Sequence, residues 1–215
     1  MSDNLPQKRI AWIDAVKGAC ILLVVIYHTV YFVFDEVIVG DMFAYKLWYA
    51  VVMALKPLRM PLFFLISGYL AYSAIFSRSW RLTRRPRIGM MMWLYGLWMA
   101  IQWLTAVLLA IYADNSLLPY VPDMAAQEFV KALVIGNNSV WYLYALALYF
   151  VVFKACRRYP IVTLVGAAVV SAIADFAIEQ WSIQSIGQNA VFFAIGCYGR
   201  DFICLLYTSP SPRDS

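Results

Sequence analysis

Apolar residues along the chain gather in long runs separated by short polar or charged segments. The runs cover residues 10–34, 60–76, 88–112, 140–153 and 161–178, and another begins near residue 186. An α-helix needs about 20 consecutive apolar residues to cross the hydrocarbon core of a bilayer, and most of these runs come close to that length. We therefore predict an all-α, polytopic transmembrane helix bundle with about six spans.

The second apolar region, residues 45–76, is too long for one straight span and has Pro57 and Pro61 near its middle. A proline inside a helix removes a hydrogen bond and kinks or breaks the helix. We predict an interfacial helix over residues 43–55, a break at 57–61 and a true span over 60–76. Farther along, Ser67 and Gly68 are small enough to let helices approach closely, so we expect them to serve packing.

Basic residues occupy every second polar segment. They occur at Lys8 and Arg9, at five arginines within residues 77–87, at residues 154–158 and at Arg200, whereas the segments between them are acidic or neutral. Cytoplasmic loops of membrane proteins carry the excess of Lys and Arg. The pattern predicts a cytoplasmic N-terminus, a cytoplasmic loop over residues 77–87, and an outer polar interval over 113–139 that holds an amphipathic turn or two around 127–134.

Composition agrees with a membrane location. The chain is 64% hydrophobic and 13% charged, whereas a soluble domain has about 25% charged residues. The formal charge of +5 could indicate a nucleic-acid partner, but the basic residues lie between apolar runs, so we expect none. Cys20 and Cys197 fall inside predicted spans and no CxxC spacing occurs, so we expect neither a disulfide framework nor a metal site.

The first apolar run holds the only histidine of the chain, His28, and begins with Asp14 and Lys17. Because a helix turns about 100° and rises about 1.5 Å per residue, Lys17 and His28 fall on nearly the same face, roughly 16 Å apart. Ionisable residues inside a membrane are costly and indicate function by default. The alternative is a structural histidine hydrogen-bonded between helices, and Asp14 is expected to cap the helix or pair with Lys17.

The segment RIAWIDAVKGACILLVVIYH, which ends at His28, resembles the opening of the bacterial acyltransferase-3 family of membrane proteins. The matching residues are Asp14, Lys17, Gly18 and His28, and the lysine, where the family more often has arginine, resembles its fucose-acetylase-like branch. Three further blocks follow in family order: RMPLFFLISGYL, VWYLYAL and NAVFFAIGCYGR. The family fold has more transmembrane helices than six, so the resemblance implies that this chain is the N-terminal portion.

The resemblance implies a multi-pass protein of the bacterial inner membrane that transfers an acyl group from acyl-CoA, with acetyl-CoA the expected donor. The acceptor would be a hydroxyl of a carbohydrate, a cell-surface glycan or a lipid-linked sugar. Membrane lipid would surround the protein. The resemblance does not indicate an oligomeric state. Lys17 suits a phosphate of the donor, and His28 suits a general base because imidazole changes charge near neutral pH.

Arg59 is the second candidate catalytic residue. Its guanidinium could stabilise the developing oxyanion or grip an anionic acceptor. The alternative is an arginine that snorkels to the outer interface.

Two other functions remain open at this point. A transporter or glycan-export component would use Lys17, His28 and Arg59 to line a path through the membrane, although no internal repeat is evident. An inactive fragment is the third possibility. The sequence contains no GxSxG, Walker or HExxH spacing, which disfavours serine hydrolases, nucleotide hydrolases and zinc proteases.

The end of the chain departs from the membrane pattern. Residues 204–214, CLLYTSPSPRD, resemble the translated read-through of a sequencing adapter, and an ordinary disordered tail is the alternative. We therefore expect an acyltransferase-3-like transmembrane domain over residues 1–203 and a non-native tail over 204–215.

Overall fold

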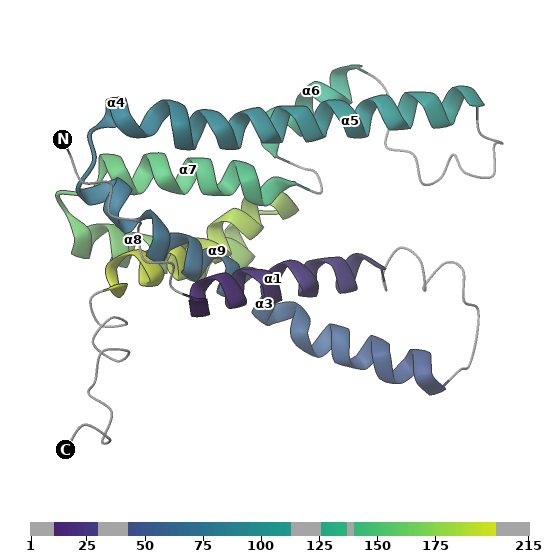
Figure 1. Cartoon of the computed structure of the whole chain (residues 1–215), viewed down its shortest axis with the longest axis horizontal. Coiled ribbons are helices and arrows are strands. Elements are labelled where there is room, and N and C mark those ends of the chain that lie inside the picture. Colours follow the sequence, from purple (N-terminus) through teal and green to yellow (C-terminus); the bar gives the residue numbers. More distant parts are fainter. Residues whose placement is uncertain (1–10, 30–42, 113–125, 137–139, 201–215) are drawn as a thin grey trace. The chain divides into compact units, whose positions relative to one another are not determined.

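The computed structural model of the chain describes residues 11–29, 43–112, 126–136 and 140–200 (Figure 1). Every regular element in these ranges is a helix, which confirms the predicted all-α class. The chain divides into two compact units, Met1–Ile66 and Ser67–Ser215. The predicted tail over residues 204–215 lies outside the described residues.

The first unit contains α1, Ala11–Thr29, and the N-terminal part of α3, Phe43–Phe76. Helix α1 lies within the predicted first span, whose last residues, 30–34, are outside the described ranges. In its final turn the Thr29 hydroxyl donates a hydrogen bond to the carbonyl of Val25 at 3.0 Å.

Helix α3 is continuous, with Pro57 and Pro61 both inside it. The predicted break at residues 57–61, with separate helices on either side, is therefore wrong. Each proline removes one backbone hydrogen bond, whereas a break in apolar surroundings would leave as many as about four N–H and four C=O groups unpaired. Each of these would cost several kcal/mol in lipid, so continuing the helix through the prolines is the cheaper outcome.

The arginine-rich segment predicted as a loop is mostly helical. It contains α4, Trp80–Thr83, and the π-helical η2, Arg84–Gly89, which leads directly into α5, Met90–Tyr112. Pro86 lies inside η2, where its missing N–H and its ring disturb the regular hydrogen-bond ladder; wider turns of this kind accommodate such defects. Helix α5 agrees with the predicted span over residues 88–112.

Helix α6, Ala126–Ile135, confirms the predicted amphipathic turns in the long polar interval. It ends at Gly136, whose φ of 76° is the left-handed conformation that favours glycine after a helix. The N–H of Gly136 donates to the carbonyl of Ala132 at 3.0 Å. The Tyr95 hydroxyl of α5 donates to the carbonyl of Leu133 at 2.9 Å, which attaches α6 to α5.

The remaining helices are α7, Trp141–Ala155, α8, Pro160–Ala177, and α9, Trp181–Tyr198. Helices α8 and α9 pack against each other, and α7 contacts both α5 and α9 (Figure 1). The Ser171 hydroxyl of α8 donates to the carbonyls of Gly187 and Gln188 in α9 at 3.0 and 2.5 Å. These bonds keep a polar side chain satisfied between two apolar helices.

Gly68 of α3 lies in direct contact with the backbone of α9. A Cβ atom at this position would lie 2.1 Å from the carbonyl oxygen of Phe193 and 2.9 Å from the nitrogen of Cys197. Only glycine allows so close an approach, so the packing role predicted for this position is confirmed.

Among the described residues, three helical segments are long and apolar enough to cross a membrane, as judged by length and composition: Lys46–Phe76, Trp80–Leu108 and Pro160–Ala177. Gly18–Tyr27 and Trp141–Ala155 are shorter apolar helices, so the count of about six spans stays a prediction. Large apolar side chains face outward, with Phe176 of α8 92% exposed, as expected for contact with lipid.

Candidate functional site

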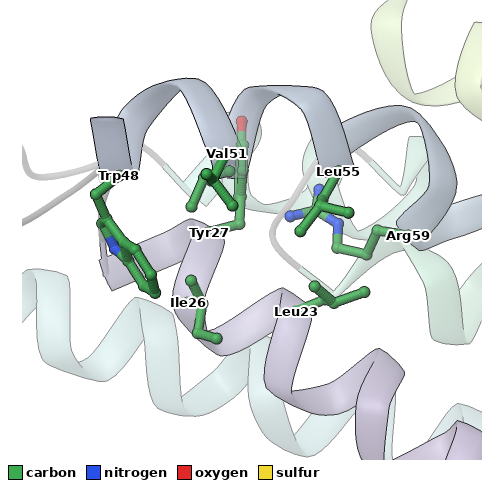
Figure 2. Close-up of a pocket in the computed structure, with 8 residues that line it drawn as sticks. Leu23, Ile26, Tyr27, Trp48, Val51, Leu55 and Arg59 are labelled. Carbon is green, nitrogen blue, oxygen red and sulfur yellow. The ribbon is translucent and has the colours of Figure 1, made fainter. Parts of the chain in front are cut away.

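A small pocket lies between α1 and the N-terminal part of α3, inside the first unit (Figure 2). It has a volume of about 50 Å³. Apart from one guanidinium and one phenol ring, its walls are aliphatic or indole side chains. The lining residues are Leu23, Ile26, Tyr27, Trp48, Val51, Val52, Leu55 and Arg59.

Helical spacing explains why these residues share the pocket. On α3 the lining positions lie three, four, seven and eleven residues after Trp48, so they follow one face of the helix. On α1 the lining positions are Leu23, Ile26 and Tyr27, which also fall on one face. Two helix faces therefore meet, and among the described residues that line the pocket the one cation is Arg59.

Arg59 is buried, with 8% of its surface exposed. Its guanidinium carbon lies 4.0 Å from the centre of the Tyr27 ring, close enough for a cation–π interaction. Figure 2 shows the side chain extending along the pocket wall toward Tyr27. In the part of the chain that the structure describes, its Nε and Nη1 atoms are buried without a hydrogen-bond partner.

Unpaired donors of this kind are expensive. Leaving a buried donor unsatisfied costs about 1–3 kcal/mol, and more when the group is charged. Aromatic contact offsets part of the charge desolvation but provides no acceptor in the plane of the guanidinium. The arrangement can therefore bind a small apolar group that carries a hydrogen-bond acceptor.

Arg59 also lies well inside its helix. Along the axis it is about 20 Å from Lys46 and about 26 Å from Phe76, the ends of the candidate span. An arginine that snorkels to an interface keeps its charged tip exposed, whereas the Nε and Nη1 atoms of Arg59 are buried. The geometry thus disagrees with the snorkelling alternative, and a functional role for Arg59 stays a prediction.

Lys17 and His28 both lie on the continuous helix α1, as the sequence predicted. The side chains of Asp14, Lys17 and His28 are outside what the structure describes, so their roles stay predictions. Position 28 follows Tyr27 directly and is about 100° around the helix from it. Arg59 therefore contacts Tyr27, the residue that precedes His28. Position 28 lies on the face of α1 next to the face that lines the pocket.

Sequence reasoning found Arg59 but missed the rest of the pocket. Tyr27, Trp48 and Leu55 are apolar or aromatic residues in a chain that is 64% hydrophobic, so nothing in their chemistry distinguishes them. One signal was available in the sequence. The apolar positions that precede Arg59 at helical spacing form a stripe along α3, and Arg59 lies at the end of this stripe. That stripe was hidden because a break was expected at residues 57–61.

The described residues contain no group of three or more His, Cys, Asp or Glu side chains that could hold a metal ion. The three cysteines in these ranges, Cys20, Cys156 and Cys197, are free thiols. The described pocket itself presents a guanidinium within apolar walls.

Comparison with known proteins gives the family. A family model described as an acyltransferase domain, of the acyltransferase-3 type, matches residues 10–205. The inner membrane protein YcfT of Escherichia coli (strain K12) is 31% identical over 215 aligned positions, which cover 90% of this chain. The chain spans 57% of the length of that curated relative, and no solved structure matches it.

The family match extends over nearly all of the described helices and includes the segments that carry Lys17, His28 and Arg59. Except for Arg9, the sequence blocks that resembled this family lie inside the matched range. The chain therefore belongs to the acyltransferase-3 family of membrane proteins.

Proposed function

We propose that this chain acts as an inner-membrane O-acyltransferase, which moves an acyl group from acyl-CoA to a hydroxyl of a carbohydrate or cell-surface glycan. The family match over residues 10–205 carries the proposal. An intramembrane arginine with unpaired donors, in a pocket beside the helix that holds Lys17 and His28, supports it. The expected donor is acetyl-CoA, and a lipid-linked sugar is one acceptor of the proposed class.

His28 is assigned the role of general base. It takes the proton of the acceptor hydroxyl while the hydroxyl oxygen bonds to the thioester carbonyl carbon. The carbon–sulfur bond then breaks, the ester is released, and the CoA thiolate recovers the proton from the imidazolium. Base assistance of this kind contributes about 10²- to 10⁴-fold to the rate.

Arg59 is assigned the role of binding the carbonyl oxygen of the thioester. That oxygen gains negative charge as the tetrahedral intermediate forms, so a guanidinium interacts with it more strongly in the transition state than in the ground state. The absence of a hydrogen-bond partner on Nε and Nη1 within the described residues leaves donors for this contact.

Lys17 is assigned the role of binding a phosphate of the donor. It lies near the N-terminal end of α1, which the charge pattern places on the cytoplasmic side, where acyl-CoA is found. An ammonium binds phosphate as a point charge, without the two-pronged geometry of arginine.

The location in the inner membrane of a bacterium is supported by YcfT, which is an inner membrane protein. The candidate spans Lys46–Phe76, Trp80–Leu108 and Pro160–Ala177 support a multi-pass arrangement.

The test uses membranes that contain the protein, acetyl-CoA radiolabelled in the acetyl group, and extraction of glycan after incubation. We expect label in the glycan that is removed by mild alkali, because O-esters are labile to base. Membranes from cells with an empty vector provide the control. Equal label in the two preparations, with the protein shown to be present, would contradict the proposal and favour the transport alternative.

A further inference from the structure

We propose that the pocket between α1 and α3 holds the acyl group of the donor and limits the enzyme to short acyl chains. This inference rests on the proposed acyl transfer and adds the substrate class that the site accepts. It assigns the pocket residues around Leu55 to acyl recognition, whereas the proposed function assigned roles only to Lys17, His28 and Arg59.

The volume of the pocket sets the size of its ligand. An apolar cavity of about 150 Å³ holds one benzene molecule, so a pocket of about 50 Å³ has room for roughly two carbon atoms. The methyl and carbonyl carbons of an acetyl group match this space. A long fatty acyl chain needs several times the volume.

The polarity of the walls matches the same ligand. Aliphatic side chains of Leu23, Ile26 and Leu55 suit a methyl group, since burying each CH₂-sized unit is favourable by about 0.8 kcal/mol. Two donors of Arg59 have no partner among the described residues, and they suit a single carbonyl oxygen. The described residues that line the pocket include no acidic side chain, so within them the charge of the guanidinium is available to an oxygen that becomes negative.

The exposure of the lining residues differs along the pocket. Val51 is 42% exposed, whereas Val52 beside it is buried. Leu55 and Arg59 lie one and two helical turns farther along α3 from Val51. Shortening Leu55 should therefore deepen the pocket without removing the donors of Arg59.

The first experiment measures transfer from acetyl-CoA, butyryl-CoA and octanoyl-CoA in membranes with wild-type protein, Leu55→Ala or Leu58→Ala. Leu58 is the matched control, because it lies on the same helix, is 59% exposed and does not line the pocket. We expect the wild type to favour acetyl-CoA and Leu55→Ala to raise the butyryl-to-acetyl ratio of kcat/KM about tenfold, since one or two methylenes discriminate by that order. Leu58→Ala should keep the wild-type ratio.

The outcomes separate the inference from the function on which it rests. If the wild type transfers acyl groups and Leu55→Ala has the same chain-length profile as Leu58→Ala, the acyl pocket is wrong and the proposed function stands. If the wild type transfers no acyl group from any of the three donors, the proposed function fails and the inference fails with it.

A second measurement covers the case in which Leu55→Ala does not accumulate. A cysteine introduced at Val51 is alkylated with a small thiol reagent, and modification at that site is read by peptide mass spectrometry. Acetyl-CoA should slow the modification at least fivefold, whereas CoA alone, acetate and palmitoyl-CoA should not, and adding Arg59→Met should abolish the protection. A cysteine at the exposed Val169 of α8 is the control.

Three results of this measurement would overturn the inference. Protection by acetate as strong as that by acetyl-CoA would indicate a site for free carboxylates. Equal protection by palmitoyl-CoA would indicate that chain length is not read here. A lack of protection by acetyl-CoA would show that the acyl group binds elsewhere.

Discussion

The ammonium group of Lys154 in α7 donates a hydrogen bond to the carbonyl of Ala74 in α3 at 2.5 Å. It also donates to the carbonyl of Arg78 at 2.8 Å, and only 1% of the Lys154 surface is exposed. The last carbonyls of a helix have no partner within the helix and carry partial negative charge, so a cation there satisfies both needs. Lys154 thus attaches α7 to the end of α3.

Replacing this lysine should weaken that attachment. Lys154→Met keeps much of the side-chain volume but leaves the carbonyls buried without a donor, and hydrogen bonds to charged groups are worth about 1.5–3 kcal/mol. We expect a clearly lower Tm in detergent for Lys154→Met. Arg158→Met removes an exposed cation from the same segment and should leave the Tm nearly unchanged; equal Tm values for the two variants would contradict the role of Lys154.

Gly68 offers a second test of packing. Gly68→Ala places a methyl 2.1 Å from the carbonyl oxygen of Phe193, so α3 and α9 must separate, and overpacking of this kind costs about 1–3 kcal/mol. The matched control is Gly166→Ala in α8, where a new Cβ meets nothing within 4 Å and helix propensity favours alanine. Thermal unfolding in detergent should show Gly68→Ala less stable than wild type and Gly166→Ala at least as stable.

Sequence and structure agree where the apolar pattern is uninterrupted and differ where one local rule was given too much weight. Helix α1 follows from an apolar run that holds neither proline nor a charge between Gly18 and Tyr27. The break at Pro57 and Pro61 was wrong because the local cost of proline was weighed without the larger cost of unpaired backbone in lipid. Residues 77–87 were read as a loop from their charge, although leucine and arginine are good helix formers.

The candidate site likewise combines a residue that the sequence singles out with residues that only the packing of helices identifies. Arg59 stood out because charges are rare in this apolar run, and its burial disagrees with the snorkelling alternative. Trp48 and Val51 could not be identified by residue type, because only the pairing of α1 with α3 makes them pocket walls. The family was accessible from sequence because its blocks extend along the chain.

The orientation of the chain can be tested by cysteine labelling. The charge pattern predicts that residue 79, beside the basic segment, faces the cytoplasm and that residue 116 faces the periplasm. A membrane-impermeant maleimide added to intact cells should label Ser116→Cys and should label Ser79→Cys only after the membrane is opened. Labelling in the opposite order would reverse the topology and place Lys17 on the wrong side for acyl-CoA.

Lys17 should affect use of the donor more than the chemical step. Lys17→Ala removes a contact with phosphate that is made equally in the ground and transition states, so the KM for acetyl-CoA should rise with little change in kcat. Lys17→Arg should be tolerated, because arginine binds phosphate at least as well. A fall in kcat at unchanged KM for Lys17→Ala would assign this residue to the reaction itself.

The central claim is that His28 is the general base of an acyl transfer. The most direct measurement is the turnover of acetyl transfer in membranes with His28→Ala, compared with wild type and with Thr29→Ala, the exposed neighbour on α1. We predict that His28→Ala lowers kcat by about 10²- to 10⁴-fold, the range for loss of a general base, at unchanged protein level in the membrane, and that Thr29→Ala stays near wild type. Near-wild-type turnover by His28→Ala would contradict the account and leave His28 as a structural residue.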